Sequence, residues 1–242
     1  MPTVQQSDVC NKLLAGLSQE DFASLQPALR IEQMQLGQVL IPAHSAIEVV
    51  YFPEEGFVSI TADGVHGRVE IGLVGREGVV GAGPMLLGDD RNPHTHFVQM
   101  AGHMLSIDAK VLRAAVERLP SLRRLLHRYI QVQHVQTAQT AFANARSNTA
   151  IRLARWLLMC HDRIDGDVVT VTQDFMSFML GVERPGVTAA LRSLEADGFV
   201  RKHRGRVEII DRDGLLDSAG DSYGTAEAEY ARLIEGRFEP GI

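Results

Sequence analysis

The sequence predicts an α+β fold: an N-terminal antiparallel β-roll resembling a jelly roll, then a long helix, then a C-terminal winged helix–turn–helix. Three observations lead to this prediction. Short β-branched runs separated by Gly, Pro and Asp clusters fill residues 31–107, at intervals of about 8–12 residues. The hydrophobic period then changes from 2 to about 3.6. Finally, a helix–glycine–helix pattern with two short strands occupies residues 172–210.

These changes of pattern divide the chain into three expected parts. We expect a β-roll domain over 1–119, a long helix over 120–146, and a winged helix–turn–helix domain with an acidic C-terminal tail over 147–242. The length of 242 residues suits two ordinary domains. Before the first strand, residues 7–29 are expected to be helical, and Ser18 with Asp21 resembles a capping box for a second short helix.

The long helix is expected to start at Pro120, because proline is tolerated in a first helical turn. A preceding helix can be capped by Asp108. One face of the long helix carries a stripe at 3–4 spacing that we assign to a dimer interface: Leu122, Leu125, Tyr129, Val132 and Gln136. The stripe fits two interpretations equally, since the helix could pack on its own domain or pair with a symmetry mate.

The C-terminal third has the pattern of two helices joined by a glycine turn. Thr172 suits the N-cap of the first helix, and Gly181 supplies a left-handed turn residue. In the second helix, Val187, Leu191 and Leu194 share one face, which leaves the polar residues of that helix facing outward. The strands FVRK and RVEII then flank a basic turn and form the wing.

Charge along the chain supports a nucleic-acid surface in this part. The net charge is −6, but residues 184–206 hold six basic and two acidic residues. Phosphate binding needs a local basic surface, not a basic chain. An arginine at the start of such a helix can reach guanine O6 and N7 in the major groove. The predicted DNA-binding residues are Thr172, Gln173, Arg184, Thr188, Arg192, Lys202 and Arg204.

The segment GVERPGVTAALRSLEADGFVRKHRGRVEI, with YFPEEGFVSI and VGREGVVG before it, resembles the Crp–Fnr family of bacterial transcription regulators over nearly the whole chain. The resemblance implies a homodimer that binds an inverted-repeat site in double-stranded DNA and works with RNA polymerase. It implies that Arg184 reads a base and that the β-roll senses a signal. Pro185 stands where many members have Glu, which puts the base read by that Glu in doubt.

The family's cyclic-nucleotide cassette carries a Gly-Glu pair and then an Arg-Ser or Arg-Thr pair. Here Val79 replaces the Glu and His94 the Arg, so we expect no binding of cyclic AMP. A cavity could still take an unidentified small-molecule effector, or none. The predicted effector-pocket residues are Gly78, Val79, Gly81, Arg91, His94, Thr95 and Gln99.

Other chemistries have weaker sequence support. Two cysteines, Cys10 and Cys160, are too few for an all-cysteine iron–sulfur cluster. The histidines that could ligate haem qualify by type only: His66, His94, His96 and His103. We therefore expect no cofactor and no metal site. GREGVVGAG precedes no helical pattern and no enzyme motif is present, so we expect no enzyme.

The remaining alternative is a cyclic-nucleotide-binding-like module that acts through protein interaction instead of DNA. The winged helix argues against it. The sequence has no run of 18 apolar residues and no secretory signal pattern, so we expect a cytoplasmic protein without membrane contact.

Overall fold

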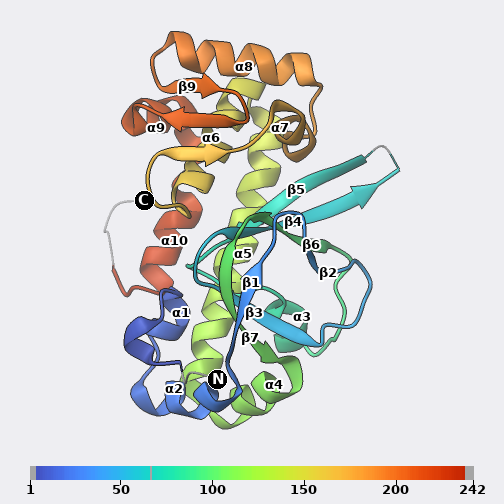
Figure 1. The fold of residues 1–242 in the computed structure, drawn as a ribbon, viewed down its shortest axis with the longest axis vertical. Coiled ribbons are helices and arrows are strands. Elements are labelled where there is room, and N and C mark those ends of the chain that lie inside the picture. Colours follow the sequence, from blue (N-terminus) through green and yellow to red (C-terminus); the bar gives the residue numbers. More distant parts are fainter. Residues whose placement is uncertain (1–3, 66, 238–242) are drawn as a thin grey trace. The chain divides into compact units, whose positions relative to one another are not determined.

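The computed structural model describes residues 4–237 except residue 66, so His66 lies outside the described residues. The chain divides into two compact units. The first contains residues 4–60, 74–132 and 230–237, and the second contains residues 61–73 and 133–229. The predicted α+β class, with N-terminal sheets, a long helix and a C-terminal helix–turn–helix, is confirmed (Figure 1).

Two sheets form the β-roll. Their strands are β1 (Arg30–Met34), β2 (Val39–Ile41), β3 (Val49–Pro53), β4 (Phe57–Gly64), β5 (Gly67–Val74), β6 (Thr95–Met100) and β7 (Gly102–Asp108). One sheet has the order β1-β7-β3 and the other β2-β6-β4-β5. Antiparallel register pairs Val50 with Ile107 and Phe52 with Leu105, and all four side chains are buried. The division between the two units falls within β4 and β5.

The N-terminal residues are helical in short pieces. They are η1 (Gln6–Asp8), α1 (Lys12–Ala15), α2 (Gln19–Leu25) and η2 (Gln26–Ala28). The Ser18 side chain accepts a hydrogen bond from the Asp21 amide at 3.1 Å, so this end of the expected capping box is present. Gly16 ends the first helix, and Leu13, Leu14, Phe22 and Leu25 anchor the pieces in the core.

Among the helices that come after β5, α3 (Ala82–Leu86) precedes β6 in the chain, while α4 (Ala109–Arg118) and α5 (Pro120–Arg146) follow β7. Asp108 caps α4 by accepting from the amides of Lys110 and Val111. The expectation that no helix follows GREGVVGAG was wrong, because Gly81 in the left-handed region (φ 90°) starts α3. The long helix α5 starts at the expected proline and spans 27 residues.

The second unit contains the winged helix–turn–helix. Its elements are α6 (Thr149–His161), β8 (Val168–Thr170), α7 (Gln173–Leu180), α8 (Arg184–Ala196), β9 (Val200–His203) and β10 (Arg206–Ile209). The three strands form an antiparallel sheet in the order β8-β10-β9. Leu153, Leu157, Val187, Leu191 and Leu194 are each at most 1% exposed, so α6 and α8 share one core.

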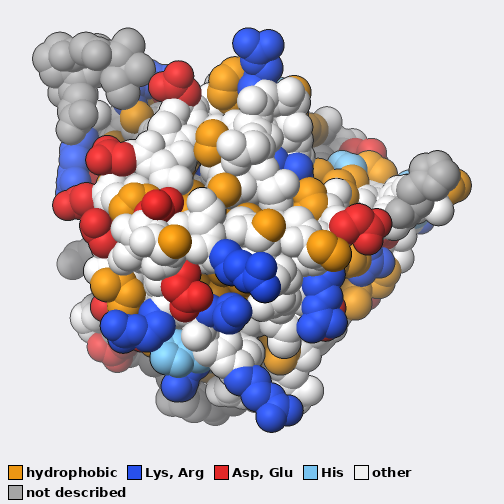
Figure 2. All heavy atoms as spheres, turned by 90° about the horizontal axis from the view of Figure 1, so that it is seen from above, with side chains coloured by type: hydrophobic (Ala, Val, Ile, Leu, Met, Phe, Trp, Pro, Cys, Tyr) orange, Lys and Arg blue, Asp and Glu red, His pale blue; other side chains and the backbone are white. Residues whose placement is uncertain are grey.

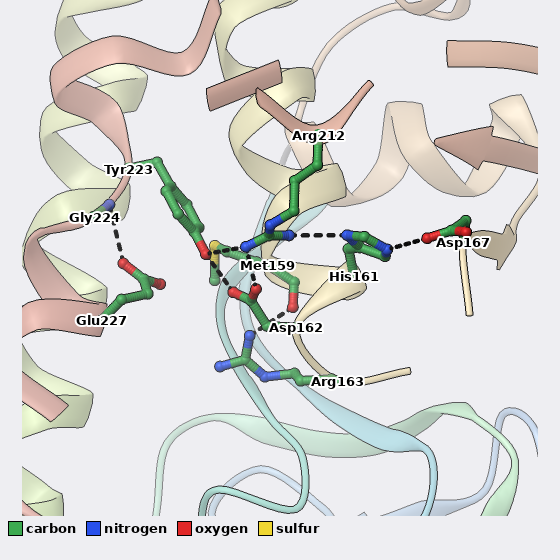
Figure 3. A network of polar contacts seen from close by, with 9 residues as sticks. All are labelled: Met159, His161, Asp162, Arg163, Asp167, Arg212, Tyr223, Gly224 and Glu227. Carbon is green, nitrogen blue, oxygen red and sulfur yellow. Dashed lines mark hydrogen bonds and ion pairs between the residues drawn. The ribbon is translucent and has the colours of Figure 1, made fainter. Parts of the chain in front are cut away.

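The segment expected to be an acidic tail is helical. It forms α9 (Arg212–Ala219), η3 (Gly220–Ser222) and α10 (Thr225–Leu233). Figure 3 shows how it is tied to the end of α6. Arg212 donates to Asp162 Oδ1 at 2.7 Å and to His161 Nδ1 at 2.9 Å, while the Tyr223 hydroxyl also donates to Asp162. His161 contacts Asp167 through its other nitrogen. Contacts with the end of α6 therefore hold a segment in place whose acidic composition alone suggests an unstructured tail.

Within the described ranges, none of the helices combines the length and apolar character required to cross a bilayer. Nor do the described residues include a group of three His, Cys, Asp or Glu side chains arranged to hold a metal ion.

Candidate nucleic-acid interface

The two helices of the candidate interface are joined by a turn that the sequence specifies locally. The Thr172 hydroxyl accepts from the Phe175 amide at 3.2 Å and caps α7. Gly181 ends α7 in the left-handed region (φ 60°), and the Val182 amide donates to the Ser177 carbonyl at 3.0 Å. The predicted cap and turn residues are therefore where the sequence analysis placed them.

A side-chain hydrogen bond fixes the start of α7 to α8. The Thr188 hydroxyl donates to Gln173 Oε1 at 2.9 Å. Arg184 is the first residue of α8, with Pro185 in the first turn as expected. The Arg184 side chain is 64% exposed and contacts the Asp174 carboxylate, with Nη1 and Oδ1 3.2 Å apart.

The wing is a short hairpin whose turn is Arg204-Gly205. Its strands pair Arg206 with His203 and Glu208 with Arg201. Glu208 accepts from His203 at 3.1 Å and from Arg201 at 3.3 Å, and the hydrogen bond from His203, then the charge of Arg201, holds the pKa of this carboxyl below its usual value. Arg201 is thus already paired, whereas Lys202 and Arg204 extend into solvent.

A hollow lies between the start of α7, the start of α8 and the wing. Its polar lining residues are Thr172, Gln173, Asp174, Arg184, Lys202, His203, Arg204 and Arg206. In Figure 2, Lys and Arg side chains lie among uncharged side chains and separate acidic ones. The described lining holds four Lys or Arg side chains and one acid, which suits a polyanion.

Five of the seven predicted DNA-binding residues line this hollow together: Thr172, Gln173, Arg184, Lys202 and Arg204. Thr188 lies next to it through its bond to Gln173, and Arg192 is exposed further along α8. Asp174, His203 and Arg206 also line the hollow but are not among the predicted DNA-binding residues. Arg206 was detectable, since it follows the glycine of the wing turn directly, whereas the position of Asp174 depends on the angle between two helices.

Strand β5 packs against the helix–turn–helix inside the second unit. Trp156 of α6 donates its indole N–H to Glu70 at 2.8 Å, and both side chains are buried. The Arg68 guanidinium lies 5.9 Å from the centre of the Phe178 ring. A Cβ on Gly181 would lie 2.7 Å from a methyl group of Val69, so the turn glycine is required for this approach as well as for its φ angle.

The predicted effector-pocket residues lie in the first unit and are mostly buried. Val79 is 1% exposed within the apolar core, and Gln99 (6% exposed) accepts from the Ser59 hydroxyl. A Cβ on Gly78 would lie 1.8 Å from the Tyr129 hydroxyl, so that side chain fills the space above the glycine. By contrast, the Arg91 side chain is 62% exposed and donates to the His44 carbonyl at 3.1 Å.

Three other pocket positions have specific surroundings. A Cβ on Gly81 would lie 2.9 Å from the end of the Ile41 side chain, and the φ angle of 90° favours glycine at this position. The His94 amide donates to Asn92 Oδ1 at 2.9 Å, and Thr95 is 5% exposed at the start of β6. These residues share the first unit, and several of them are buried in its packed interior.

The predicted dimer stripe on α5 is also buried within the chain. Leu122, Tyr129 and Val132 belong to the core of the first unit, and Leu125 packs against it. Gln136 accepts from the Leu73 amide at 2.9 Å in the second unit. Of the two interpretations of this stripe, the structure shows packing of the helix on its own chain.

Comparison with known proteins was informative for both units. Residues 151–218 match the Crp-like helix-turn-helix domain family. The HTH-type transcriptional regulator Cmr of Mycobacterium tuberculosis is 22% identical over 203 residues, which cover 83% of this chain and 81% of that protein.

Solved structures share the fold. FixK2 from Bradyrhizobium japonicum aligns with a TM-score of 0.68 at 15% identity, over 79% of this chain and 98% of that one. The c-di-GMP responsive global regulator CLP of Xanthomonas campestris aligns with a TM-score of 0.64 at 15% identity, over 79% and 99% of the chains. At such identities the likeness establishes architecture, not ligands.

Proposed function

We propose that this chain is a transcription regulator that binds an inverted-repeat DNA site as a homodimer. The proposal is supported by the match of residues 151–218 to the Crp-like helix-turn-helix domain family and by the similarity of the chain to the regulator Cmr. The matched relatives are transcription regulators rather than enzymes. In this proposal Arg184 reads a base in the major groove, and the wing residues Lys202, Arg204 and Arg206 contact phosphates.

The observation that carries the proposal is the hollow between α7, α8 and the wing. It joins an exposed arginine at the start of α8 to three basic wing side chains, within one polar surface. A base edge and a phosphate differ in position and charge, since the guanine acceptors are neutral and lie in the major groove, whereas phosphate oxygens are charged acceptors along the backbone. Arg184 suits the first because it lies at the start of the second helix of the helix–turn–helix, and the exposed basic residues of the wing suit the second.

The proposed homodimer uses the exposed face of α5. Because the stripe from Leu122 to Gln136 is buried in the chain, the available residues are on the opposite face. They are small or apolar near the end of the helix: Ala138, Ala141, Phe142 and Ala145. Phe142 is 44% exposed, and small neighbours allow two helices to approach closely. Light scattering tests this directly: we expect dimers of the natural protein and monomers of Phe142→Asp.

We further propose a role for each part of the chain. Residues 1–119 sense a signal other than cyclic AMP, residues 120–146 form the dimer helix, and residues 147–242 bind DNA and contact RNA polymerase.

The buried, apolar setting of Val79 supports the proposal that the signal is not cyclic AMP, because no carboxylate is present there to bind ribose hydroxyls. Calorimetric titration with cyclic AMP is expected to give no binding at micromolar concentrations, and tighter operator binding in its presence would contradict the proposal.

Selection of bound fragments from a random DNA pool, followed by two variants, tests the base-reading role. Arg184→Ala should lower affinity for the selected site by about 1–3 kcal/mol and relax one base position. Arg204→Ala should weaken the selected and a scrambled duplex equally and reduce the salt slope by about one phosphate contact. If Arg184→Ala weakens both duplexes equally, Arg184 contacts the backbone and does not read a base.

A further inference from the structure

One acidic side chain stands inside the basic hollow. Asp174 is the single acid among the described residues that line it, and it contacts the arginine proposed to read a base. Its carboxylate lies 3.2 Å from Arg184 Nη1, and both side chains are largely exposed, at 70% and 64%. A carboxylate facing DNA weakens attraction to phosphates, so its presence calls for an explanation.

The backbones that carry this pair are fixed. Asp174 is the second residue of α7, whose first turn is capped by Thr172, and the Asp174 carbonyl accepts from the Ser177 hydroxyl at 2.8 Å. The bond between Gln173 and Thr188 ties the neighbouring positions of α7 and α8 together. The starts of α7 and α8 therefore place the carboxylate within reach of the guanidinium.

Electrostatics at the start of α8 adds a second reason. A helix N-terminus carries a partial positive charge, so an arginine at the first position is unfavourable there. The first turn of α8 contains no acid, and the Glu183 side chain at the N-cap makes no capping hydrogen bond. Asp174, which comes from a different helix, supplies the compensating negative charge.

The pairing leaves the arginine able to bind a base. A guanidinium has five N–H donors, and a contact at Nη1 leaves the donors of Nη2 and Nε free. Guanine needs two parallel donors, so the carboxylate and the base can be bound at the same time. A phosphate, in contrast, would be repelled by the carboxylate next to it.

We infer that Asp174 is a positioning residue that sets DNA specificity: it holds the Arg184 guanidinium toward the base edge and keeps it from pairing with phosphates. This inference rests on the proposed function of Arg184. On non-matching DNA the arginine remains neutralised by Asp174 and releases no counterion. On the matching site it gains two base contacts without losing its carboxylate partner.

The experiment compares Asp174→Asn with the natural protein on the selected and scrambled duplexes over a range of salt. We expect scrambled-DNA affinity to rise about three-fold, with a salt slope steeper by about one counterion, because Arg184 becomes free to pair with phosphate. Affinity for the selected site should change less, so the specificity ratio falls.

Asp197→Asn is the matched control, since it removes the same charge from the exposed C-cap of α8, roughly 20 Å along the helix. It should leave the ratio unchanged. In the double variant Asp174→Asn/Arg184→Ala, the effect of Asp174→Asn on the ratio should disappear.

Two results would overturn the inference: Asp174→Asn strengthens both duplexes by the same factor, or its effect persists without Arg184. Either would make Asp174 a general surface charge. If Arg184→Ala alone leaves the ratio of selected to scrambled affinity unchanged, Arg184 does not read a base and the proposed function fails. This single variant therefore distinguishes failure of the proposed function from failure of the inference about Asp174.

Discussion

The nucleic-acid interface and the predicted effector region of the β-roll place their polar side chains in opposite environments. At the interface, Arg184 and Asp174 are more than 60% exposed and are held by one surface ion pair. In the β-roll, Thr95, His96 and Gln99 are at most 6% exposed. Exposed pairs contribute little to stability, whereas buried polar groups must be satisfied or they destabilise the fold. The exposed pair is therefore expected to affect DNA binding more than stability, and the buried polar residues to affect stability more than binding.

Gly78→Ala in the β-roll is expected to have the largest effect on stability. A small effect would contradict the view that this region is set by close packing. The new Cβ would lie 1.8 Å from the buried Tyr129 hydroxyl, so we expect a loss of about 3 kcal/mol in the free energy of unfolding. Denaturant unfolding measures it. Affinity for the selected DNA should be unchanged for the folded fraction.

A double variant separates packing from ligand binding at this glycine. In a Tyr129→Ala background, Gly78→Ala should cost little more, because the atoms it overlaps are gone. An equal cost in both backgrounds would mean that Gly78 is needed for something other than space for Tyr129.

The buried His96 of the β-roll is expected to make the stability of the fold depend on pH. Burial, and then the nearby His94, lowers the pKa of His96 to about 4, while the unfolded value is near 6.5. Below pH 6.5 the unfolded chain therefore takes up a proton that the folded chain refuses. Stability should fall by about 3 kcal/mol between pH 6.5 and pH 4, with no contribution from this group above pH 6.5.

His96→Gln should remove that part of the pH dependence, while His127→Gln, at an exposed position of α5, should keep it. Thermal unfolding at pH 7 and pH 4.5 gives both slopes. Equal slopes for all three proteins would show that other groups cause the loss in acid.

Tyr223→Phe is expected to change the free energy of unfolding less than Gly78→Ala or the protonation of His96. Burial raises the pKa of Tyr223, so its hydroxyl stays protonated and donates to Asp162 while accepting from Arg212 at 3.2 Å. Removing it should cost about 1 kcal/mol of stability, since Arg212 still pairs with Asp162. Gel-shift affinity should not change. A loss of DNA specificity would contradict this prediction, because it would show that the contacts of Tyr223 with Asp162 and Arg212 affect DNA binding as well as stability.

Local signals explain what could be predicted. A threonine cap, a left-handed glycine and three apolar residues on one face define α7, the turn and α8, and each of these acts within a few residues of sequence. The wing is predictable for the same reason. Its basic turn and short alternating strands need no information from distant parts of the chain.

Long-range contacts explain what could not. The stripe on α5 gives the same periodicity whether it packs on the β-roll or on a second copy, and only burial distinguishes them. The C-terminal helices look like an acidic tail until Arg212 and Tyr223 are seen against Asp162. Likewise, Asp174 gains its meaning from a residue ten positions later on another helix.

Trp156 is the one tryptophan among the 242 residues, and it is buried with its N–H bonded to Glu70 of β5. The protein therefore contains a single tryptophan fluorophore, beside four tyrosines, and it is located where β5 meets α6. Tryptophan emission comes from this one side chain, so a shift in its wavelength on adding DNA or a metabolite reports a change in the surroundings of Trp156. A label-free optical assay for effectors is thus built into the natural chain.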